Sequence, residues 1–287
     1  MNRGALIFAH NNADVDYGLM AVISGGLAKK NLKIPVSLVT DKWTLAWLNE
    51  SNMLDVARSV FDKIIEIEKP ITSNVRKLHD GFHGKIVPFV NSNRCSAWDL
   101  SPYDKTLLLD SDYLIFSNTL NEYWEVDTPI MMSHSMNDIV GNRSQILDQR
   151  VSETGIHMFW ATTVMFDNSS ESQFFFKLVD YIKDNYAYYA DLFRFNPKQY
   201  RNDIAFSVAK HVINGFETEF VYTLPPVLTV FDKDILHTVD ASGKLTFLID
   251  MPHDCGNFWG TTTSGMDVHV MNKQSIIRNK EQLLALI

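Results

Sequence analysis

Cysteine is scarce in this sequence: its 287 residues include only Cys95 and Cys255, whose positions match no metal-site spacing. So few cysteines, without an export signal, predict free thiols. The sequence also lacks any apolar run near the roughly 20 residues that cross a bilayer. Its first apolar run, residues 5–9, is shorter than the roughly 7–15 residues of a secretory signal core, so we interpret it as a strand. These absences favour a cytoplasmic protein without a membrane span.

Basic residues are fewer than acidic residues in this sequence. The chain has 26 lysine and arginine residues against 34 aspartate and glutamate residues, which gives a formal net charge of −8. Binding along nucleic acid depends on neutralising phosphates with basic side chains, so this balance argues against a broad nucleic-acid footprint. A local basic groove stays open as an alternative.

Strand-like and helix-like segments alternate along the chain. Strand-like residues are 5–9, 36–39, 63–67, 106–109 and 159–166, and helical spacing is found at 16–30, 43–48, 53–61 and 170–185. This alternation predicts an α/β fold with a mostly parallel sheet flanked by helices. Residues 71–95 and 133–155 show weak periodicity, and we interpret them as long loop insertions. Because no repeat or linker is found, we predict a single domain over residues 1–287.

Two aspartates separated by one residue, Asp110 and Asp112, are the most informative feature of the sequence. They follow the apolar residues 107–109, which we expect to form a strand buried on both faces. Side chains two positions apart on an extended segment project to the same side, and open α/β sheets bind ligands beyond the carboxyl ends of their strands. Paired carboxylates need a compensating charge, and oxygen ligands favour Mg²⁺ or Mn²⁺. The alternative is a chance triplet that only ends a strand.

The surroundings of this pair resemble a known family. Residues 101–115 read Ser-Pro-Tyr-Asp-Lys-Thr-Leu-Leu-Leu-Asp-Ser-Asp-Tyr-Leu-Ile and resemble the DXD segment of GT-A glycosyltransferases. Residues 8–17 resemble the family's first strand and donor loop, and residues 159–166 resemble the strand after its acceptor loop. The resemblance implies a Rossmann-like GT-A fold and a hexosyl- or pentosyltransferase. It also implies Mn²⁺ or Mg²⁺ on the acidic pair, and a nucleotide-sugar donor, with a UDP-linked sugar favoured.

The same resemblance implies roles for residues outside the acidic pair. Residues 267–273 are similar to a C-terminal segment that often supplies a third metal ligand, here His269, and a cation for phosphate. The segment lacks the Gly-X-X-Lys-Pro-Trp sequence of glycogenin-like members, so a histidine that binds no metal is an equal alternative. The implied nucleotide-sugar-binding residues are His10, Asn11, Tyr17, Asp41, Arg94, Ser111 and Lys273. Residues 1–116 would then form the donor-binding half, and residues 117–287 the acceptor half with the C-terminal metal and phosphate segment.

Asp203 is the predicted catalytic carboxylate, with Asn202 as its hydrogen-bonding neighbour, because residues 200–205 resemble the family's helix start near the reacting sugar. In an inverting enzyme Asp203 would act as general base for the acceptor hydroxyl. In a retaining enzyme it would stabilise the cationic sugar or position the acceptor. A helix N-terminus favours a charged carboxylate in either case, and an ordinary first-turn acid fits the same pattern.

The acceptor is the least constrained part of the prediction. Residues 25–30 and 36–41 resemble transferases carried by T-even-like bacteriophages, which implies 5-hydroxymethylcytosine in phage DNA as acceptor and the host cytoplasm as location. Such an enzyme has to reach the base edge or extrude the base. The basic and aromatic stretch near Arg194 and the loop with Arg143 and Arg150 fit that requirement. Glycosylation of a protein, lipid or polysaccharide is the main alternative.

Two further classes of protein use a similar motif or fold. A sugar nucleotidyltransferase also holds Mg²⁺ on paired aspartates, but it usually has a glycine-rich phosphate loop after its first strand. Here the loop after residues 5–9 contains no glycine until Gly18. A non-catalytic binding or virion protein would keep the fold without metal-dependent binding of a nucleotide sugar.

Overall fold

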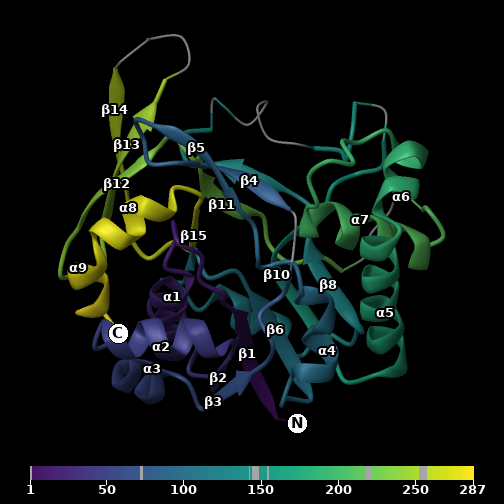
Figure 1. Cartoon of the computed structure of the whole chain (residues 1–287), viewed down its shortest axis with the longest axis horizontal. Coiled ribbons are helices and arrows are strands. Elements are labelled where there is room, and N and C mark those ends of the chain that lie inside the picture. Colours follow the sequence, from purple (N-terminus) through teal and green to yellow (C-terminus); the bar gives the residue numbers. More distant parts are fainter. Residues whose placement is uncertain are drawn as a thin grey trace.

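The centre of the molecule is a six-stranded sheet in the order β3-β2-β1-β6-β10-β8 (Figure 1). The computed structural model describes residues 2–71, 74–141, 143, 149–153, 155–217, 222–251 and 257–287. The parallel strands are β1 (Arg3–Phe8), β2 (Val36–Thr40), β3 (Lys63–Glu66) and β6 (Lys105–Leu109). The strand β10 (Trp160–Asp167) runs antiparallel to both β6 and β8 (Ile130–Ser133). The predicted α/β class with a mostly parallel sheet is confirmed.

The central strands are apolar because helices and neighbouring strands remove them from water. Every residue of β6 is buried, which confirms the doubly buried strand expected at residues 107–109. The first helix, α1 (Tyr17–Leu32), packs on β1 and β2. Its start is fixed by Asp16, whose side chain accepts a hydrogen bond from the Leu19 amide, an N-cap that satisfies one of the free donors of the first turn.

The remaining predicted helices are also found. They are α2 (Lys42–Glu50), α3 (Leu54–Val60) and α5 (Ser170–Asp184). In α5 the side chains of Phe175, Val179 and Ile182 are buried, whereas Phe174 and Tyr181 are exposed, so one aromatic face packs inward as its spacing predicts. Further along the chain, α7 (Asn202–Ile213) packs on both α5 and β10. Two further short helical segments are η2 (Thr119–Tyr123) and α6 (Tyr186–Phe193).

A second sheet connects the acidic pair to the C-terminal part of the chain. Its order is β7-β15-β11-β9, formed by β7 (Tyr113–Leu114), β15 (Val268–Val270), β11 (Val227–Val230) and β9 (Met136–Asp138). The antiparallel pairing of β15 with β7 sets His269 opposite Tyr113. A residue late in the sequence is thereby fixed one position from Asp112.

The C-terminal part also forms an antiparallel sheet and two short helices. The sheet contains β12 (Ile235–Val239), β13 (Leu245–Asp250) and β14 (Phe258–Thr263). The helices α8 (Lys273–Arg278) and α9 (Lys280–Leu284) pack against α1, so the end of the chain lies on its first helix (Figure 1). One hydrophobic core draws side chains from both residues 1–116 and residues 117–287.

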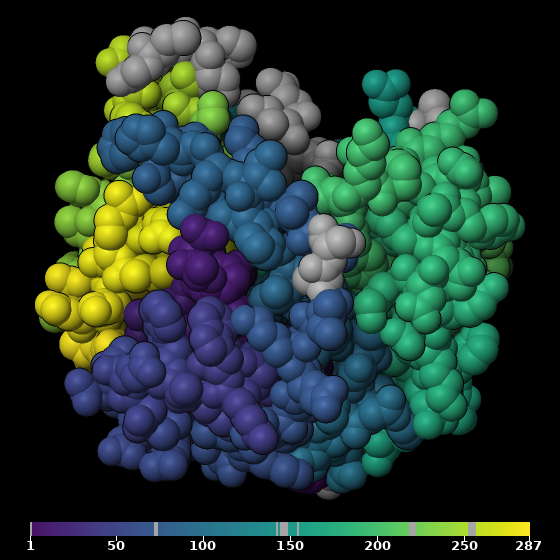
Figure 2. Space-filling view, viewed as in Figure 1, coloured from purple at the N-terminus to yellow at the C-terminus, as the bar shows by residue number. Residues whose placement is uncertain are grey.

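The expected loop at residues 71–95 contains regular structure instead. A hairpin is formed by β4 (Val75–His79) and β5 (Gly84–Pro88), and it is followed by η1 (Arg94–Ser96) and α4 (Ala97–Leu100). The hairpin lies at the surface between the C-terminal helices and the segment of α5 to α7 (Figure 2). Polar and apolar residues do not alternate regularly in these two strands, and Gly84 and Pro88 stand in β5, so periodicity alone does not predict them.

Arg143 does not lie on an exposed acceptor loop, which corrects the prediction that it serves a DNA-binding surface. Its guanidinium is buried and forms paired hydrogen bonds with the carboxylates of Asp138 and Asp234. Burial alone would lower the pKa of Arg143, but the two carboxylates outweigh it and raise that pKa. An arginine neutralised in this way has no donors left for phosphate. Arg150 and Arg194, in contrast, are exposed.

Three remaining expectations concern thiols and membranes. Cys95 is a free, buried thiol, as predicted, and Cys255 lies outside the described residues. Within the ranges that the structure describes, none of the helices combines the length and the apolar character needed to cross a bilayer.

Candidate active site

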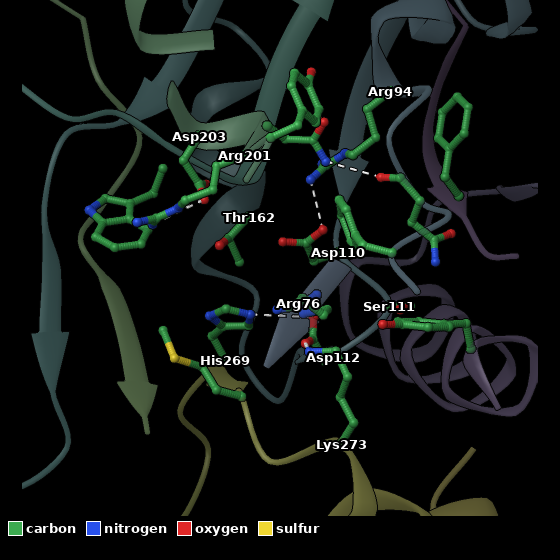
Figure 3. Close-up of a pocket in the computed structure, with 18 of the residues that line it drawn as sticks. Arg76, Arg94, Asp110, Ser111, Asp112, Thr162, Arg201, Asp203, His269 and Lys273 are labelled. Atoms are coloured by element: carbon green, nitrogen blue, oxygen red, sulfur yellow. Dashed lines mark hydrogen bonds and ion pairs between the residues drawn. The ribbon is translucent and has the colours of Figure 1, made fainter. Parts of the chain in front are cut away.

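A cavity of about 300 Å³ lies next to the carboxyl ends of β1 and β6. Figure 3 shows the acidic pair between groups contributed by both halves of the sequence. Four cationic side chains and three carboxylates are part of the wall. These are Arg76, Arg94, Arg201 and Lys273, with Asp110, Asp112 and Asp203. A concave site with this many opposed charges is suited to a small, highly charged ligand.

Asp110 and Asp112 occupy the turn that leaves β6. The Asp110 amide donates to the Thr162 carbonyl at 3.0 Å, and the Asp110 carbonyl accepts from the Tyr113 amide at 3.2 Å, so the backbone holds both carboxyl groups at the cavity. One ligand atom each from Asp110, Asp112 and His269 lie within 4.8 Å of one another. The structure therefore brings together the three residues that the sequence predicts as metal ligands.

The chemistry of these three side chains fits a divalent cation. Two carboxylates and one imidazole match the oxygen-rich ligation that Mn²⁺ and Mg²⁺ accept. His269 Nε2 lies 3.3 Å from Asp112 Oδ1. Its Nδ1 is buried and has no hydrogen-bond partner in the described part of the chain. The imidazole is therefore held at the carboxylates by the β15–β7 pairing and not by a hydrogen bond to the core.

Two protein cations neutralise the acidic pair. The Lys273 ammonium donates to Asp112 Oδ2, and Arg94 Nη1 donates to Asp110 Oδ1 at 2.7 Å. Lys273 is the first residue of α8, far after the pair in the sequence, whereas Arg94 opens η1 and lies 16 residues before Asp110. Both are buried, and Arg94 Nε and Nη2 lack partners among the described residues. Burying an N–H donor without a hydrogen-bond partner costs free energy. An anionic ligand that accepts these hydrogen bonds would recover that cost.

The two carboxylates have different protonation behaviour. Burial raises the pKa of Asp110, although Arg94 opposes the shift. Burial also acts on Asp112, but Lys273 and His269 outweigh it and hold the pKa of that carboxyl well below its usual range. Lys273 and His269 therefore favour the charged form of Asp112.

Arg76 is a site residue that the sequence reasoning missed. It projects from the β4–β5 hairpin into the cavity, and its guanidinium carbon lies 5.1 Å from the ring centre of Phe89. Burial would lower the pKa of Arg76, but Tyr17, Asp112 and Asp110 outweigh it and raise that pKa. No local signal marked this arginine, because only the hairpin fold directs it at residues far along the chain.

Asp203 and Asn202 reach the cavity from the first turn of α7. Asp203 Oδ1 accepts a hydrogen bond from the Ala161 amide at 2.9 Å, and Oδ2 lies 3.5 Å from an Arg201 guanidinium nitrogen. Asn202 Nδ2 donates to the Asn91 carbonyl at 3.1 Å. Asp203 is therefore tied to β10 and does not cap its own helix, and its Oδ2 lies next to Arg201, another residue of the cavity wall. The catalytic role of both residues stays a prediction.

The predicted donor-binding residues fall into two groups. Tyr17, Arg94, Ser111 and Lys273 line the cavity. His10, Asn11 and Asp41 are buried and are not part of its wall; His10 Nδ1 lies 2.7 Å from Asp41 Oδ2. Burial opposes the charge of Asp41, but hydrogen bonds from His10 and Thr44 outweigh it and lower the pKa.

The second group, His10, Asn11 and Asp41, stabilises the loop after β1 through hydrogen bonds. The His10 amide donates to the side chain of Asn91, a residue of the cavity wall, and the Asn11 amide donates to Thr44. The first contact links the loop to the cavity wall, and the second links it to α2. Direct contact of His10, Asn11 and Asp41 with a donor stays a prediction.

Neither a family model nor a curated protein sequence matches the chain. Among solved structures it is similar to the glycosyltransferase GlyE of Streptococcus pneumoniae TIGR4 in its apo form, at 14% identity over 64% of this chain and 39% of that one, with a TM-score of 0.37. It is also similar to the galactosyltransferase LgtC with donor and acceptor sugar analogues, at 12% identity over 72% of this chain and 70% of that one, with a TM-score of 0.42.

A third similar structure is apo mouse xyloside xylosyltransferase 1, at 9% identity over 75% of this chain and 83% of that one, with a TM-score of 0.42. The chain spans about two fifths of the length of GlyE. These scores are too low to carry a functional argument, so the function has to be inferred from the site itself.

Proposed function

We propose that the protein is a metal-dependent glycosyltransferase of the GT-A type, which transfers a sugar from a nucleoside diphosphate to an acceptor hydroxyl. The observation that carries this proposal is the cluster of Asp110, Asp112 and His269 at the carboxyl edge of the mostly parallel sheet. Ligands of α/β proteins bind at this edge. The cluster is surrounded by cations that suit phosphate, and the sequence around it resembles a GT-A DXD segment.

The ligands of a divalent cation, Mn²⁺ or Mg²⁺, would be Asp110, Asp112 and His269. When bound, such an ion supplies Lewis acidity for the leaving diphosphate. Arg94 and Lys273 bring fixed positive charge to the same place, and the unpaired nitrogens of Arg94 have donors to give to phosphate oxygens. Ser111 and Tyr17 line the same cavity and are further proposed donor contacts.

The transfer forms a bond between the acceptor oxygen and the anomeric carbon, and breaks the bond from that carbon to the diphosphate oxygen. The acceptor proton leaves to Asp203 in an inverting reaction, or to the departing diphosphate in a retaining one. Two features support either role for Asp203: the hydrogen bond it accepts from the Ala161 amide, and its position at the N-terminus of α7, which favours a charged carboxylate. Asn202, fixed to the Asn91 carbonyl, would orient the acceptor or the sugar beside it.

A panel of nucleotide sugars with Mn²⁺, followed by thermal unfolding, tests the donor proposal. A ligand at 100 times its Kd stabilises the folded state by about 2.7 kcal/mol, so the true donor should raise the melting temperature. We expect UDP-linked sugars to do so only with Mn²⁺ or Mg²⁺ present. The effect should vanish in Asp112→Asn and persist in Asp191→Asn, a control on the exposed surface of α6. No stabilisation by any nucleotide sugar with metal would refute the proposal and favour a non-catalytic binding protein.

The acceptor and the location stay predictions, with residues 117–287 as the acceptor half and the cytoplasm as the place of action. Fewer basic residues support 5-hydroxymethylcytosine in phage DNA as the acceptor than the sequence suggests, because Arg143 is buried in salt bridges with two carboxylates. Arg150 and Arg194 still border a second cavity with Phe193 and Phe216. Transfer of labelled sugar to hydroxymethylated duplex DNA, with salt-sensitive binding, would support this acceptor. Labelling of a protein, lipid or polysaccharide alone would exclude it.

A further inference from the structure

Without a donor, Asp112 already has a partner. The Lys273 ammonium donates to its Oδ2, and Lys273 is 3% exposed, so this is a buried ion pair. Arg94 Nη1 forms a similar ion pair with Asp110 Oδ1 at 2.7 Å. Arg76 lies close enough to both carboxylates for them to raise the pKa of its guanidinium. The acidic pair therefore carries internal counterions at the place where a metal ion would bind.

A metal ion and the Lys273 ammonium compete for the carboxylate of Asp112. Two cations on one carboxylate repel each other, and the repulsion is strong because a buried site is screened little by water and salt. The backbone of Lys273 is fixed, since Asn272 caps α8 by accepting a hydrogen bond from the Ser275 amide. Only the lysine side chain is free to leave Asp112, and an ammonium leaves a buried carboxylate readily only when another anion receives it.

We propose that Lys273 is an internal competitor of the metal ion, which makes metal binding depend on the nucleoside diphosphate. This inference rests on the proposed function. In the free protein, Lys273 holds Asp112 and keeps the affinity for the metal low. An arriving diphosphate offers its oxygens to Lys273, and Asp112 is released to the metal. Metal and nucleotide therefore bind with positive coupling, each raising the affinity for the other.

Mn²⁺ alone is the probe that isolates this effect, because no nucleotide is needed. Binding is measured by isothermal titration and by the electron paramagnetic resonance signal of free Mn²⁺, on the wild type and three variants. Lys273→Met removes the competitor and should tighten the binding of Mn²⁺ alone by about tenfold, the scale on which one nearby charge acts. Lys273→Arg keeps the charge and should bind Mn²⁺ as weakly as the wild type.

Lys29→Met is the matched control, since it makes the same change in net charge at a half-buried lysine that pairs with Asp62 and is not part of the cavity wall. It should leave the affinity for Mn²⁺ unchanged. Two outcomes would show that Lys273 is not a competitor. In the first, Lys273→Met binds Mn²⁺ no more tightly than the wild type. In the second, Lys29→Met binds Mn²⁺ as tightly as Lys273→Met does.

The coupling itself is measured by repeating the titration of the wild type and Lys273→Met with saturating UDP. The wild type should gain at least about tenfold in affinity for Mn²⁺, and the variant should gain much less, since its Asp112 is already released. An equal gain in both proteins would overturn the inference but would leave the proposed function intact. If UDP-linked sugars and UDP fail to bind with any metal, the proposed function is refuted, whereas the comparison with Mn²⁺ alone still decides whether Lys273 competes.

Discussion

His269 Nε2 lies 3.3 Å from Asp112 Oδ1, and the cause is the pairing of β15 with β7. Because β7 begins one residue after Asp112, a strand that pairs with it places its own side chains at the acidic turn. A slip of one residue in this pairing would turn Val268 or Val270 toward the carboxylates, since neighbours on a strand face opposite sides. The register of a two-residue strand thus decides whether the cluster has a third candidate metal ligand.

Arg76→Ala should weaken the binding of a nucleoside diphosphate in the presence of Mn²⁺. Hydrogen bonds to charged groups contribute about 1.5–3 kcal/mol, so we expect a loss of about tenfold or more in affinity. Lys77→Ala is the control, because Lys77 is the next residue on β4 and is exposed. Isothermal titration with UDP measures both. Equal affinities for the two variants would mean that the hairpin does not contribute a diphosphate ligand.

Asp203→Asn should lower kcat and leave the affinity for the donor nearly unchanged. The amide oxygen of asparagine still accepts the hydrogen bond from the Ala161 amide, so the local structure is kept while the base is lost. General base catalysis typically contributes about 10²–10⁴-fold, and a loss on that scale in kcat is expected. Steady-state kinetics and donor titration separate the two quantities. A variant with full turnover would remove Asp203 from the mechanism.

Arg143→Met should destabilise the fold without acting on the site directly. It leaves the buried carboxylates of Asp138 and Asp234 without their shared partner, and breaking a buried ion pair costs about 3–5 kcal/mol. Arg58→Met removes an exposed pair with Asp55 and should cost less than about 1 kcal/mol. Urea unfolding of the two variants gives the comparison. Similar stabilities would mean that the buried cluster contributes little.

Cys95 should be unreactive in the folded protein near pH 8. Burial raises the pKa of its thiol to about 11 from 9.0, despite the nearby Lys183. Because the thiolate is the nucleophile, alkylation at pH 8 should be about 100-fold slower than in the urea-unfolded chain. The raised pKa also means that folding stability falls as pH rises from 9 toward 11, since the unfolded thiol ionises first. Mass spectrometry of the Cys95 peptide after iodoacetamide treatment follows the reaction; equal folded and unfolded rates would contradict the assigned burial.

The sequence predicts those parts of the molecule that local patterns determine. The strand at residues 107–109 is a run of leucines followed by aspartates, and both its burial and the placement of Asp110 and Asp112 at the sheet edge follow from that run. His269 and Lys273 were found only through their resemblance to a C-terminal family segment. Their proximity to Asp112 depends on the pairing of two very short strands, which no periodicity reveals.

Other features depend on contacts between distant residues, and these the sequence does not reveal. Arg76 lies in a polar stretch without a strand pattern, and its role in the cavity follows from the hairpin alone. Arg143 is surrounded in sequence by polar residues, so it was predicted to be exposed. Its burial depends on Asp234, which is 91 positions away and accepts two of the four hydrogen bonds from its guanidinium to carboxylates.

The most direct test of the central claim is the identity of the product released from a UDP-linked sugar in the presence of Mn²⁺. The cluster of Asp110, Asp112 and His269 predicts that the wild type releases UDP, slowly to water and faster when an acceptor is supplied. Chelation of the metal, or either of Asp110→Asn and Asp112→Asn, should abolish that release. Release of pyrophosphate from a nucleoside triphosphate and a sugar phosphate, or UDP release that survives loss of both aspartates, would contradict the account.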